Sequence, residues 1–574
     1  MINFPYGQEI KKVIEKDINF ITEEKIRMED GVNISVKIWL PANVNERTPT
    51  ILMLTPYISD EGHNYGMFFA IRGYAFVCAD CRGRGNSEGW FYPMENDGKD
   101  GAEIVEWIAK QDWCNGQVAM MGGSYRGMVQ WQTLMHFPPS LKTIVPTCSV
   151  GPGIDYPQPG NIFYSFMARW LSLVDGKTGN RPLFSDGSYW ANKFYKMHKE
   201  YIPFSKLDKL CGCRSEIFQR WLAHPDYDEY WKRMVPQKSD YEKINIPILT
   251  ITGYFDDDQP GAMSYYLNHM KFGNKESLQN HYLLIGPYDH EGTRFPQKQL
   301  GGLNFGDNCI IDMLQLHLEW FDWILKGKDK PNFLKDRIIY YLMGENIWKT
   351  ANSIDGMANN KYKLFLSSKA KNPSIEKAKG LSEKQENDRD DSYYIYNPKD
   401  IIPQNKYFEV KSDFLTDQYD AHLNNSIVFE TEPLSEPIEI SGYIKFFAFM
   451  QIDAPDTDFN VNLYEIQRDY SSIFLTGDMM RARYRNSSSK PKLLNPDEIC
   501  LYEFKNFYIF SRKVQKGSRL RLVISPLNSP DFQKNYNSGG CIADESINVG
   551  REVKVKIFHN AKYPSYLEIP IMKT

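Results

Sequence analysis

Short runs of consecutive apolar residues recur along the first half of the chain, and segments with helical spacing of apolar positions separate them. Continuous apolar runs are typical of parallel strands that helices cover on both faces. A hairpin is expected first, at 18–40, with its turn at 29–31. The alternation that follows predicts an α/β fold with a doubly wound parallel sheet, whose strands we expect at 50–54, 75–79, 118–121, 144–147, 246–251 and 281–285.

One interval between expected strands is too long for a loop. Between 147 and 246 lie about a hundred residues, whereas ordinary connections are far shorter. The segment is rich in Trp, Tyr and Phe, which favours a folded, mostly helical insertion over disorder. Because it follows the carboxyl end of a strand, we expect it to cover that end of the sheet. Most of its aromatic side chains would form its own core, and a minority, with Trp170 as a candidate, would line a substrate pocket.

After about residue 335 the helical periodicity ends and β-type runs follow, at 392–396, 427–431, 443–450, 459–466, 499–508, 519–524 and 553–558. Antiparallel strands without crossover helices predict a sandwich or jelly roll. A highly charged stretch at 372–391 is expected to be an exposed loop. The expected domains are therefore a catalytic α/β domain (1–150 and 241–335), an inserted helical cap (151–240) and an all-β domain (336–574).

Composition narrows the class of protein. A chain of 574 residues is too long to fold around a single hydrophobic core, so several domains are expected. A net charge of −4 gives no electrostatic reason to bind nucleic acid or anionic lipid. The first residues lack the apolar stretch of a signal peptide, and the sequence contains no run of about 18 apolar residues that could span a membrane. We expect a small-molecule substrate and no nucleic-acid or membrane partner. The oligomeric state is left open, with a homodimer among the options.

The cysteines indicate a reduced, metal-free protein. There are nine, an odd number scattered along the chain, which suits the cytoplasm better than a disulfide framework. Cys78 and Cys81 form one close pair, and Cys211 and Cys213 another, but no His or Cys nearby completes a tetrahedral zinc set. We therefore expect no metal and no cofactor.

The most informative motif follows the apolar run at 118–121, where the chain reads Gly122-Gly-Ser-Tyr-Arg-Gly127. A strand that ends in glycines and turns at once into a helix forces the serine between them into a strained conformation and exposes its hydroxyl. Such a serine can attack a carbonyl if a base and an acid approach it from elsewhere. By itself the motif fits equally well a glycine-rich turn with a chance serine at position 124.

Two later strand ends offer the missing groups in the order Ser, acid, His. The run at 246–251 leads into Gly253-Tyr-Phe-Asp256, and the run at 281–285 into Gly286-Pro-Tyr-Asp-His290. His290 would take the proton of Ser124, and Asp256 would fix the imidazole tautomer and stabilise the imidazolium. None of the other nine histidines combines a strand-end position with this chain order.

A tetrahedral oxyanion needs hydrogen-bond donors, and the loss of one costs about 2.7–4 kcal/mol. The backbone N–H of Tyr125, the residue after the serine, is the first candidate. The loop after the run at 50–54 should supply the second, and the phenol of Tyr57 is placed there. A purely structural, buried tyrosine at position 57 is the alternative.

With these residues, the chain resembles the cocaine esterase / X-Pro dipeptidyl-peptidase family of serine hydrolases nearly from end to end. The resemblance implies an α/β-hydrolase domain, a helical cap and a carboxy-terminal jelly roll. It also implies that Ser124 is the nucleophile, Asp256 the acid and His290 the base, with Tyr57 and the Tyr125 amide as the oxyanion hole. The matching stretches are Pro56-Tyr57, 80–89, 107–116, 123–131, 253–256, 286–290, 453–458, 481–485 and 563–566.

Two substrate classes follow from the resemblance. An acyl hydrolase would cleave a small ester or amide through an acyl-enzyme on Ser124. An X-Pro peptidase or α-amino-acid ester hydrolase would need a carboxylate to hold a free α-ammonium group, and Asp257 and Asp258 are candidates. The alternative is that both are solvated loop acids. About fifty residues precede the first parallel strand, fewer than the extra amino-terminal domain of the peptidases would need, which favours the acyl hydrolase. A non-catalytic binding protein would not need the complete set of candidate residues.

Overall fold

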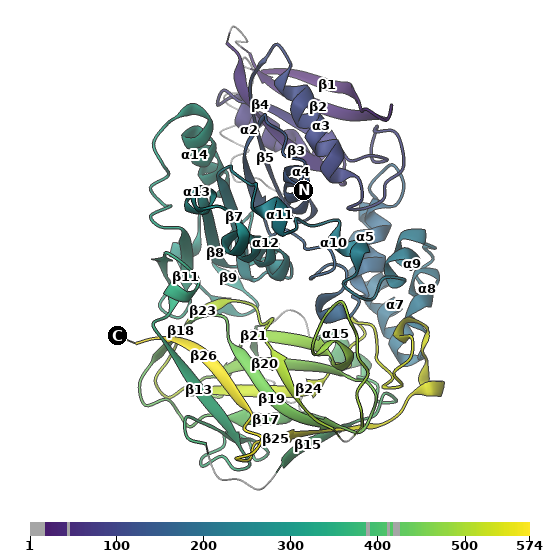
Figure 1. Cartoon of the computed structure of the whole chain (residues 1–574), viewed down its shortest axis with the longest axis vertical. Helices are drawn as coiled ribbons and strands as arrows, with labels where there is room; N and C mark the ends of the chain where they lie inside the picture. Colours follow the sequence, from purple (N-terminus) through teal and green to yellow (C-terminus); the bar gives the residue numbers. More distant parts are fainter. Residues whose placement is uncertain are drawn as a thin grey trace.

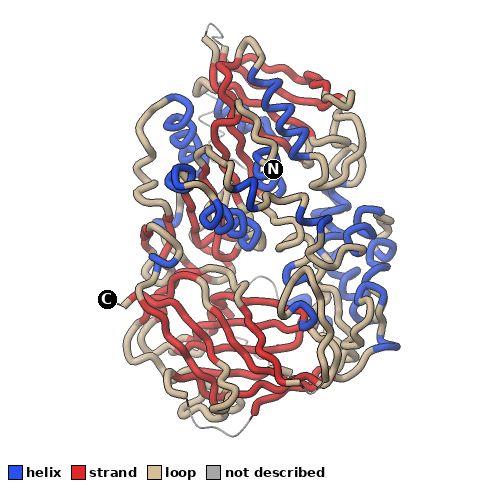
Figure 2. Tube along the Cα trace, in the orientation of Figure 1, coloured by secondary structure: helices blue, strands red, loops and turns tan. Residues whose placement is uncertain are grey.

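The structure is a computed structural model of the chain, described for residues 18–42, 46–385, 391–409, 414–416, 425–496 and 498–573. An α/β domain, a helical cap beside it and a β domain make up the molecule (Figure 1). Helices surround the sheet of the first domain and form the cap, whereas the β domain is almost all strand and loop (Figure 2). This architecture confirms the predicted fold class. Residues 1–17, on which the absence of a signal peptide was argued, lie outside the described residues.

A ten-stranded sheet forms the core of the α/β domain, in the order β1-β2-β4-β3-β5-β6-β7-β8-β11-β12. The strands from β3 to β8, together with β11, run parallel, and the outer pairs are antiparallel. Central strands such as β4 and β7 are buried along their whole length, as their continuous apolar runs predict. The strands are β1 (Ile18–Arg27), β2 (Asn33–Pro41), β3 (Thr48–Thr55), β4 (Ala75–Asp80), β5 (Cys114–Gly123), β6 (Leu141–Thr147), β7 (Ile248–Phe255), β8 (His281–Asp289), β11 (Ile338–Leu342) and β12 (Ile347–Ala351).

The catalytic domain extends beyond the predicted boundary at 335. Strand β11 pairs in parallel with β8, and β12 pairs with β11, so the sheet continues to Ala351. The last helix of the domain, α14 (Met313–Lys326), is the crossover that makes this pairing possible. The sequence pattern marked the end of helical periodicity correctly, but one further parallel strand and its hairpin partner follow the last helix.

Helices cover both faces of the sheet. The apolar residues of α3 (Asp97–Ala109) and α4 (Tyr125–Leu134) share one core cluster with β5, and those of α2 (His63–Ala70) and α14 share another with β3. The chain is therefore doubly wound, as predicted. Two further helices, α12 (Gln259–Phe272) and α13 (Lys275–Gln279), connect β7 to β8. A small hairpin, β9 (Gln299–Leu300) and β10 (Leu303–Asn304), lies between β8 and α14.

The segment between β6 and β7 is a helical cap, as the long aromatic interval predicts. Its tryptophans Trp190, Trp221 and Trp231 are fully buried in the same cluster as the helices on one face of the sheet. The buried Arg84, in the loop after β4, fastens the cap by donating to the backbone oxygens of Pro56 (2.7 Å) and Val174 (2.8 Å). The cap helices are α5 (Phe166–Val174), α6 (Arg181–Ser185), α7 (Gly187–Lys199), α8 (Leu207–Leu210), α9 (Glu216–Leu222), α10 (Glu229–Lys232) and α11 (Lys238–Tyr241).

The β domain contains all seven predicted β-type runs as strands, with additional strands between them. The charged stretch 372–391, expected as a loop, contains β14, because Ala378 and Leu381 are buried there; residues 386–390 lie outside the described residues. The elements are β13 (Asn360–Ser367), β14 (Lys379–Ser382), β15 (Asp391–Tyr396), α15 (Gln404–Glu409), β16 (Leu415–Thr416), β17 (Ile427–Glu430), β18 (Ile438–Gly442), β19 (Lys445–Ile452), β20 (Asp458–Ile466), β21 (Ser472–Arg481), β22 (Ile499–Phe504), β23 (Phe510–Val514), β24 (Arg519–Pro526), β25 (Val553–Phe558) and β26 (Tyr566–Met572).

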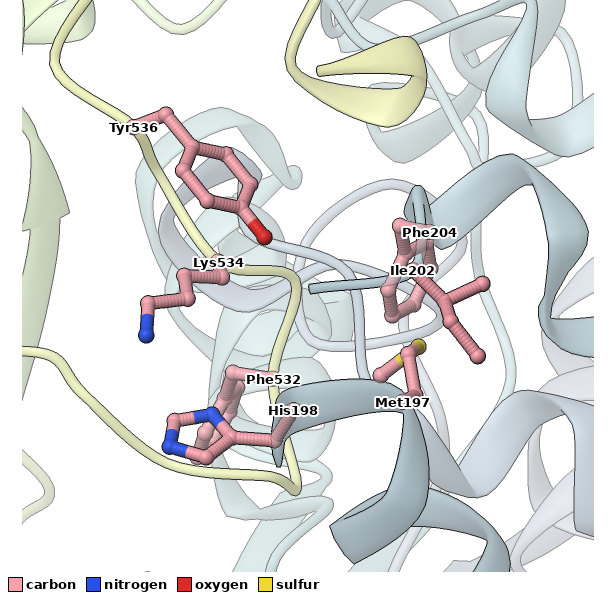
Figure 3. Close-up of a pocket in the computed structure, with 7 residues that line it drawn as sticks. All are labelled: Met197, His198, Ile202, Phe204, Phe532, Lys534 and Tyr536. Carbon is pink, nitrogen blue, oxygen red and sulfur yellow. The ribbon is translucent and has the colours of Figure 1, made fainter. Parts of the chain in front are cut away.

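The β domain is fixed to the other two parts by buried polar contacts. The Gln259 side chain, at the start of α12, donates to the Ile509 oxygen (3.1 Å) and accepts from the Ile509 N–H (2.7 Å). Arg481 forms a buried ion pair with Asp458 (2.9 Å) and donates to the Asn161 oxygen of the cap (2.9 Å). A small pocket lies between α7 and the loop that carries Lys534 and Tyr536 (Figure 3).

Replacing Arg481 with Ala should destabilise the fold by about 3–5 kcal/mol, because the buried Asp458 carboxylate would lose its partner. Urea unfolding would measure the change in the free energy of unfolding. Lys361→Ala is the matched control, since its ion pair with Glu568 is exposed on the lysine side and should contribute less than about 1 kcal/mol. Equal losses in the two variants would contradict this role of the Arg481 pair.

Acid should also destabilise the protein through a buried histidine pair. The Nδ1 atoms of His269 and His281 lie 2.8 Å apart. Burial lowers the pKa of His269 from 6.5 to about 4 and that of His281 well below 6.5. Both stay neutral in the fold but gain protons when unfolded, so stability is full above pH 6.5 and falls as the pH drops towards about 4. The melting temperature should therefore fall below pH 6.5, with a smaller slope in His269→Gln than in the parent. The exposed His63→Gln control should keep the slope of the parent.

Candidate active site

Ser124 lies at the sharp junction between β5 and α4, where the sequence predicts a strained turn. Its φ is 64° and its ψ −128°, a conformation that non-glycine residues rarely adopt. The Ser124 N–H donates to the Thr147 oxygen at the end of β6 (2.9 Å). A Cβ atom at Gly127 would lie 2.8 Å from that same oxygen, and one at Gly122 would lie 2.6 Å from the Cβ of Arg126. The two glycines are therefore needed for the turn that presents the serine.

Asp256 and His290 meet at the ends of β7 and β8. His290 Nδ1 lies 2.9 Å from Asp256 Oδ1. The Asp256 carboxylate is fully buried and also accepts hydrogen bonds from the Thr252 hydroxyl (3.0 Å) and the Asp258 N–H (3.1 Å). Since Nδ1 faces the carboxylate, the other ring nitrogen, Nε2, is the one left to exchange a proton with a nucleophile or leaving group.

The surroundings of His290 favour its protonated form. Burial alone lowers the imidazole pKa, but Cys148, the charge of Asp258 and the hydrogen bond to Asp256 outweigh it, so the pKa lies well above 6.5. An imidazolium formed when a serine proton is transferred would be stabilised by the same negative groups.

Of the two predicted amine anchors, only Asp258 lies at the serine. Its Oδ2 is 3.5 Å from the Ser124 Oγ and 3.5 Å from His290 Nδ1. The side chain is 15% exposed, and burial, with the charges of Asp155 and Asp256, raises its pKa well above the usual range. Asp257 is exposed and lines a separate cavity of about 1340 Å³ at the junction of the three domains.

The predicted oxyanion donors occupy suitable positions. Tyr125 is the first residue of α4, where backbone N–H groups have no partner within the helix. The Tyr57 hydroxyl accepts a hydrogen bond from Trp170 Nε1 (3.1 Å), which leaves its own proton free to donate. Burial raises the pKa of Tyr57, so the phenol keeps that proton, and the charges of His290 and Asp258 act on it. This position fits a site donor better than a purely structural tyrosine.

Trp170 connects the cap to the site. Its ring stacks on Tyr125, with centroids 5.7 Å apart, and on Trp221 of α9, with centroids 6.3 Å apart. Because Trp170 is 5% exposed and bonded to Tyr57, it orients the phenol and forms a wall of the site rather than an open binding surface.

Two residues in the segment that follows β6 were not predicted from the sequence. Asp155 is buried and accepts backbone hydrogen bonds from Gly151 (2.7 Å) and Gly261 (2.5 Å). Cys148 is fully buried, and its sulfur lies 4.0 Å from the His290 oxygen. Burial opposes ionisation of this thiol, but the charges of His290 and Arg294 lower its pKa. Their positions could have been predicted from the sequence, because the parallel strand β6 ends at the same edge of the sheet as β7 and β8.

The chain matches two family models in succession. Residues 30–292 match the X-Pro dipeptidyl-peptidase (S15 family), and residues 334–568 match the X-Pro dipeptidyl-peptidase C-terminal non-catalytic domain. A cocaine esterase from Rhodococcus sp. (strain MB1 Bresler) is 25% identical, over 98% of this chain and all of that protein. The chain belongs to the cocaine esterase / X-Pro dipeptidyl-peptidase family. As a member of this family, it is a serine hydrolase.

Two solved structures share the fold of this serine hydrolase almost completely. An aminopeptidase from a Thaumarchaeota archaeon has a TM-score of 0.84 at 21% identity, covering 98% of this chain and 97% of that one. An α-amino acid ester hydrolase has a TM-score of 0.83 at 20% identity, covering 97% of both chains. No helix in the described parts of the chain is long and apolar enough to cross a membrane.

Replacing Ser124 with Ala should abolish hydrolysis and leave the free energy of unfolding within about 0.5 kcal/mol of the parent, because the hydroxyl makes one long contact. Residual activity above about one per cent of the parent would contradict the assignment of the nucleophile.

Asp256→Asn should lower kcat by about four orders of magnitude, since an amide favours the wrong imidazole tautomer. Asp257→Asn is the matched control and should change kcat little, because that side chain lines the separate cavity. Both variants need initial-rate measurements on one ester. A comparable loss in the two would contradict the distinct role of Asp256.

Proposed function

We propose that the protein hydrolyses a small carboxylic ester through an acyl-enzyme on Ser124. The observation that carries this proposal is the strained Ser124 turn beside the buried Asp256–His290 pair, joined at 2.9 Å. A cocaine esterase among the relatives supports the ester class. The free cysteines, nine in all, support a place in the cytoplasm, where thiols stay reduced.

The reaction follows from the geometry. The step starts from neutral His290, with its proton on Nδ1 beside Asp256. The Ser124 oxygen attacks the carbonyl carbon as His290 Nε2 takes the hydroxyl proton, which requires the hydroxyl to leave Asp258 for the imidazole. The oxyanion accepts hydrogen bonds from the Tyr57 phenol and the Tyr125 N–H. His290 then gives its proton to the departing alkoxide, which leaves as an alcohol. Water, deprotonated by His290, cleaves the acyl-serine and releases the carboxylic acid.

A specific observation favours an acyl group with a free α-amine. Asp258 presents a mostly buried carboxyl group 3.5 Å from the Ser124 oxygen. Among the described residues, its side chain faces His290 Nδ1 at 3.5 Å and bonds to no Lys or Arg. Burial disfavours the ionised form of this carboxyl group in the free site, and a substrate ammonium group at short range would stabilise that form. The amine of an α-amino acyl group sits one carbon from the carbonyl that Ser124 attacks, so both could bind at once.

The 3.5 Å distance between Asp258 Oδ2 and the Ser124 oxygen argues against an X-Pro dipeptide as the substrate. In a dipeptidyl substrate the amine lies about one residue, or 3.3–3.6 Å, further from the scissile carbonyl than in a single amino acyl group. Asp258 contacts the nucleophile itself and therefore suits the shorter substrate. We propose an α-amino-acid ester, or the amide of a single amino-terminal residue, as the preferred substrate.

An assay with four substrates tests both the ester hydrolysis and the recognition of a free amine. The substrates are p-nitrophenyl acetate, alanine p-nitrophenyl ester with its N-acetylated form, and Ala-Pro p-nitroanilide. We expect Ser124-dependent hydrolysis of the esters and a preference in kcat/KM for the free amine over the acetylated form. Asp258→Asn should reduce that preference by about 10–100-fold, the value of a buried charge pair of 1.4–2.8 kcal/mol, and Asp257→Asn should not.

The possible outcomes distinguish the serine mechanism, the amine anchor and the dipeptidyl alternative. Hydrolysis that persists in Ser124→Ala would overturn the serine mechanism. An unchanged preference in Asp258→Asn, or none in the parent, would overturn the amine anchor and leave the esterase. Efficient cleavage of Ala-Pro p-nitroanilide would show that the dipeptidyl alternative is correct.

A further inference from the structure

Three neighbouring strand ends bring a thiol, an imidazole and a carboxylate together. The ligand atoms of Cys148, Asp256 and His290 all lie within 4.8 Å of one another, after β6, β7 and β8 respectively. Cys148 and Asp256 are fully buried, and His290 is about one-third exposed. Cys148 has a φ of 39°, outside the usual range for a side-chain-bearing residue, and its N–H donates to the Ile251 oxygen of β7 (2.7 Å). The backbone thus holds the thiol against the other two groups.

These three groups are the ligand types that Zn²⁺ prefers. At Zn–S of about 2.3 Å and Zn–N or Zn–O of about 2.0–2.2 Å, tetrahedral ligands lie about 3.4–3.6 Å apart. Separations of at most 4.8 Å reach that geometry with side-chain shifts of about 1 Å. Three protein ligands with a fourth position open to water is a common zinc arrangement.

We propose that Cys148, Asp256 and His290 form a binding site for Zn²⁺, and that occupation of this site switches the enzyme off. Binding replaces the thiol proton of Cys148 and the proton on the liganding nitrogen of His290, and both protons are released to solvent. Two of the three ligands are the proposed base and its carboxylate, so a bound ion would keep His290 from accepting the Ser124 proton. Metal binding and turnover would therefore exclude each other. Only the inhibition depends on the proposed function; the binding depends on the ligand geometry.

The neighbourhood limits the affinity of this site. The Arg294 guanidinium donates to the His290 oxygen (3.2 Å) and to Glu291 (3.0 Å). A Cβ atom built on Gly123 would lie 3.2 Å from both Arg294 Cδ and the Cys148 sulfur, so the Arg294 side chain passes beside the thiol. The positive charge of Arg294 would repel a zinc ion in the site. We therefore expect reversible inhibition at micromolar Zn²⁺ rather than a permanently bound structural ion.

The experiment compares the parent with Cys148→Ala and with Cys309→Ala, whose buried thiol bonds to the Gly306 oxygen. Binding is measured without substrate, by titrating Co²⁺ and following the thiolate-to-cobalt absorption band. Inhibition is measured separately, by titrating Zn²⁺ during ester hydrolysis and then adding a chelator. Cys148→Gly is a second variant, since glycine adopts a positive φ without strain should the alanine variant fail to fold.

We expect the parent and Cys309→Ala to show the cobalt band and chelator-reversible inhibition. Cys148→Ala or Cys148→Gly should lose the band. Relative to each variant's own rate without metal, each should need about tenfold or more Zn²⁺ for the same fractional inhibition. A parent without the band, or equal Zn²⁺ sensitivity in parent and variants, would overturn the proposal. A parent that shows the band but hydrolyses no ester would leave the metal site standing and overturn the proposed function instead.

Discussion

The site depends on the backbone conformation of one residue, Ser124. Its positive φ directs the hydroxyl away from the sheet and towards the ends of β7 and β8, and such a conformation costs about 1–3 kcal/mol. The cost is offset by the hydrogen bond to Thr147 and by two glycines whose missing side chains allow the close packing. Every other group of the site is useful only because the serine is presented in this way. The surrounding sheet is rigid and buried, so it can hold the strain.

The carboxyl edge of the parallel sheet supplies the remaining chemistry. The adjacent strands β5, β6, β7 and β8 are directly followed by Ser124, Cys148, Asp256 and His290, and the order of the strands in the sheet places those residues at one edge. Asp256 and His290 were predictable because each follows a glycine just past a buried run. Position alone points to Cys148, which directly follows β6, and the glycine rule points to Asp155, which follows Gly151 and Gly153. These two were missed because neither belongs to a known catalytic order, and because the zinc ligands of the proposed site come from separate strands with no short spacing.

Other differences from the sequence reasoning also have physical causes. Alternation of strand and helix predicted the sheet and the inserted cap, but the final strand β11 follows a crossover helix at a point where composition already changes, so the boundary at 335 was placed too early. Asp257 and Asp258 are adjacent in sequence and cannot be told apart by pattern. Where β7 passes into α12, they face different spaces, and only the second reaches the serine.

The core of the β domain does not stop at the domain border. Its apolar cluster includes Tyr254 and Phe255 of β7, Leu283 of β8 and Ile338 of β11. It therefore shares side chains with the strands that lead into Asp256 and His290. Two segments that match separate family models thus share one apolar core. An exchange of the β domain between relatives would have to carry the matching face of the hydrolase sheet with it.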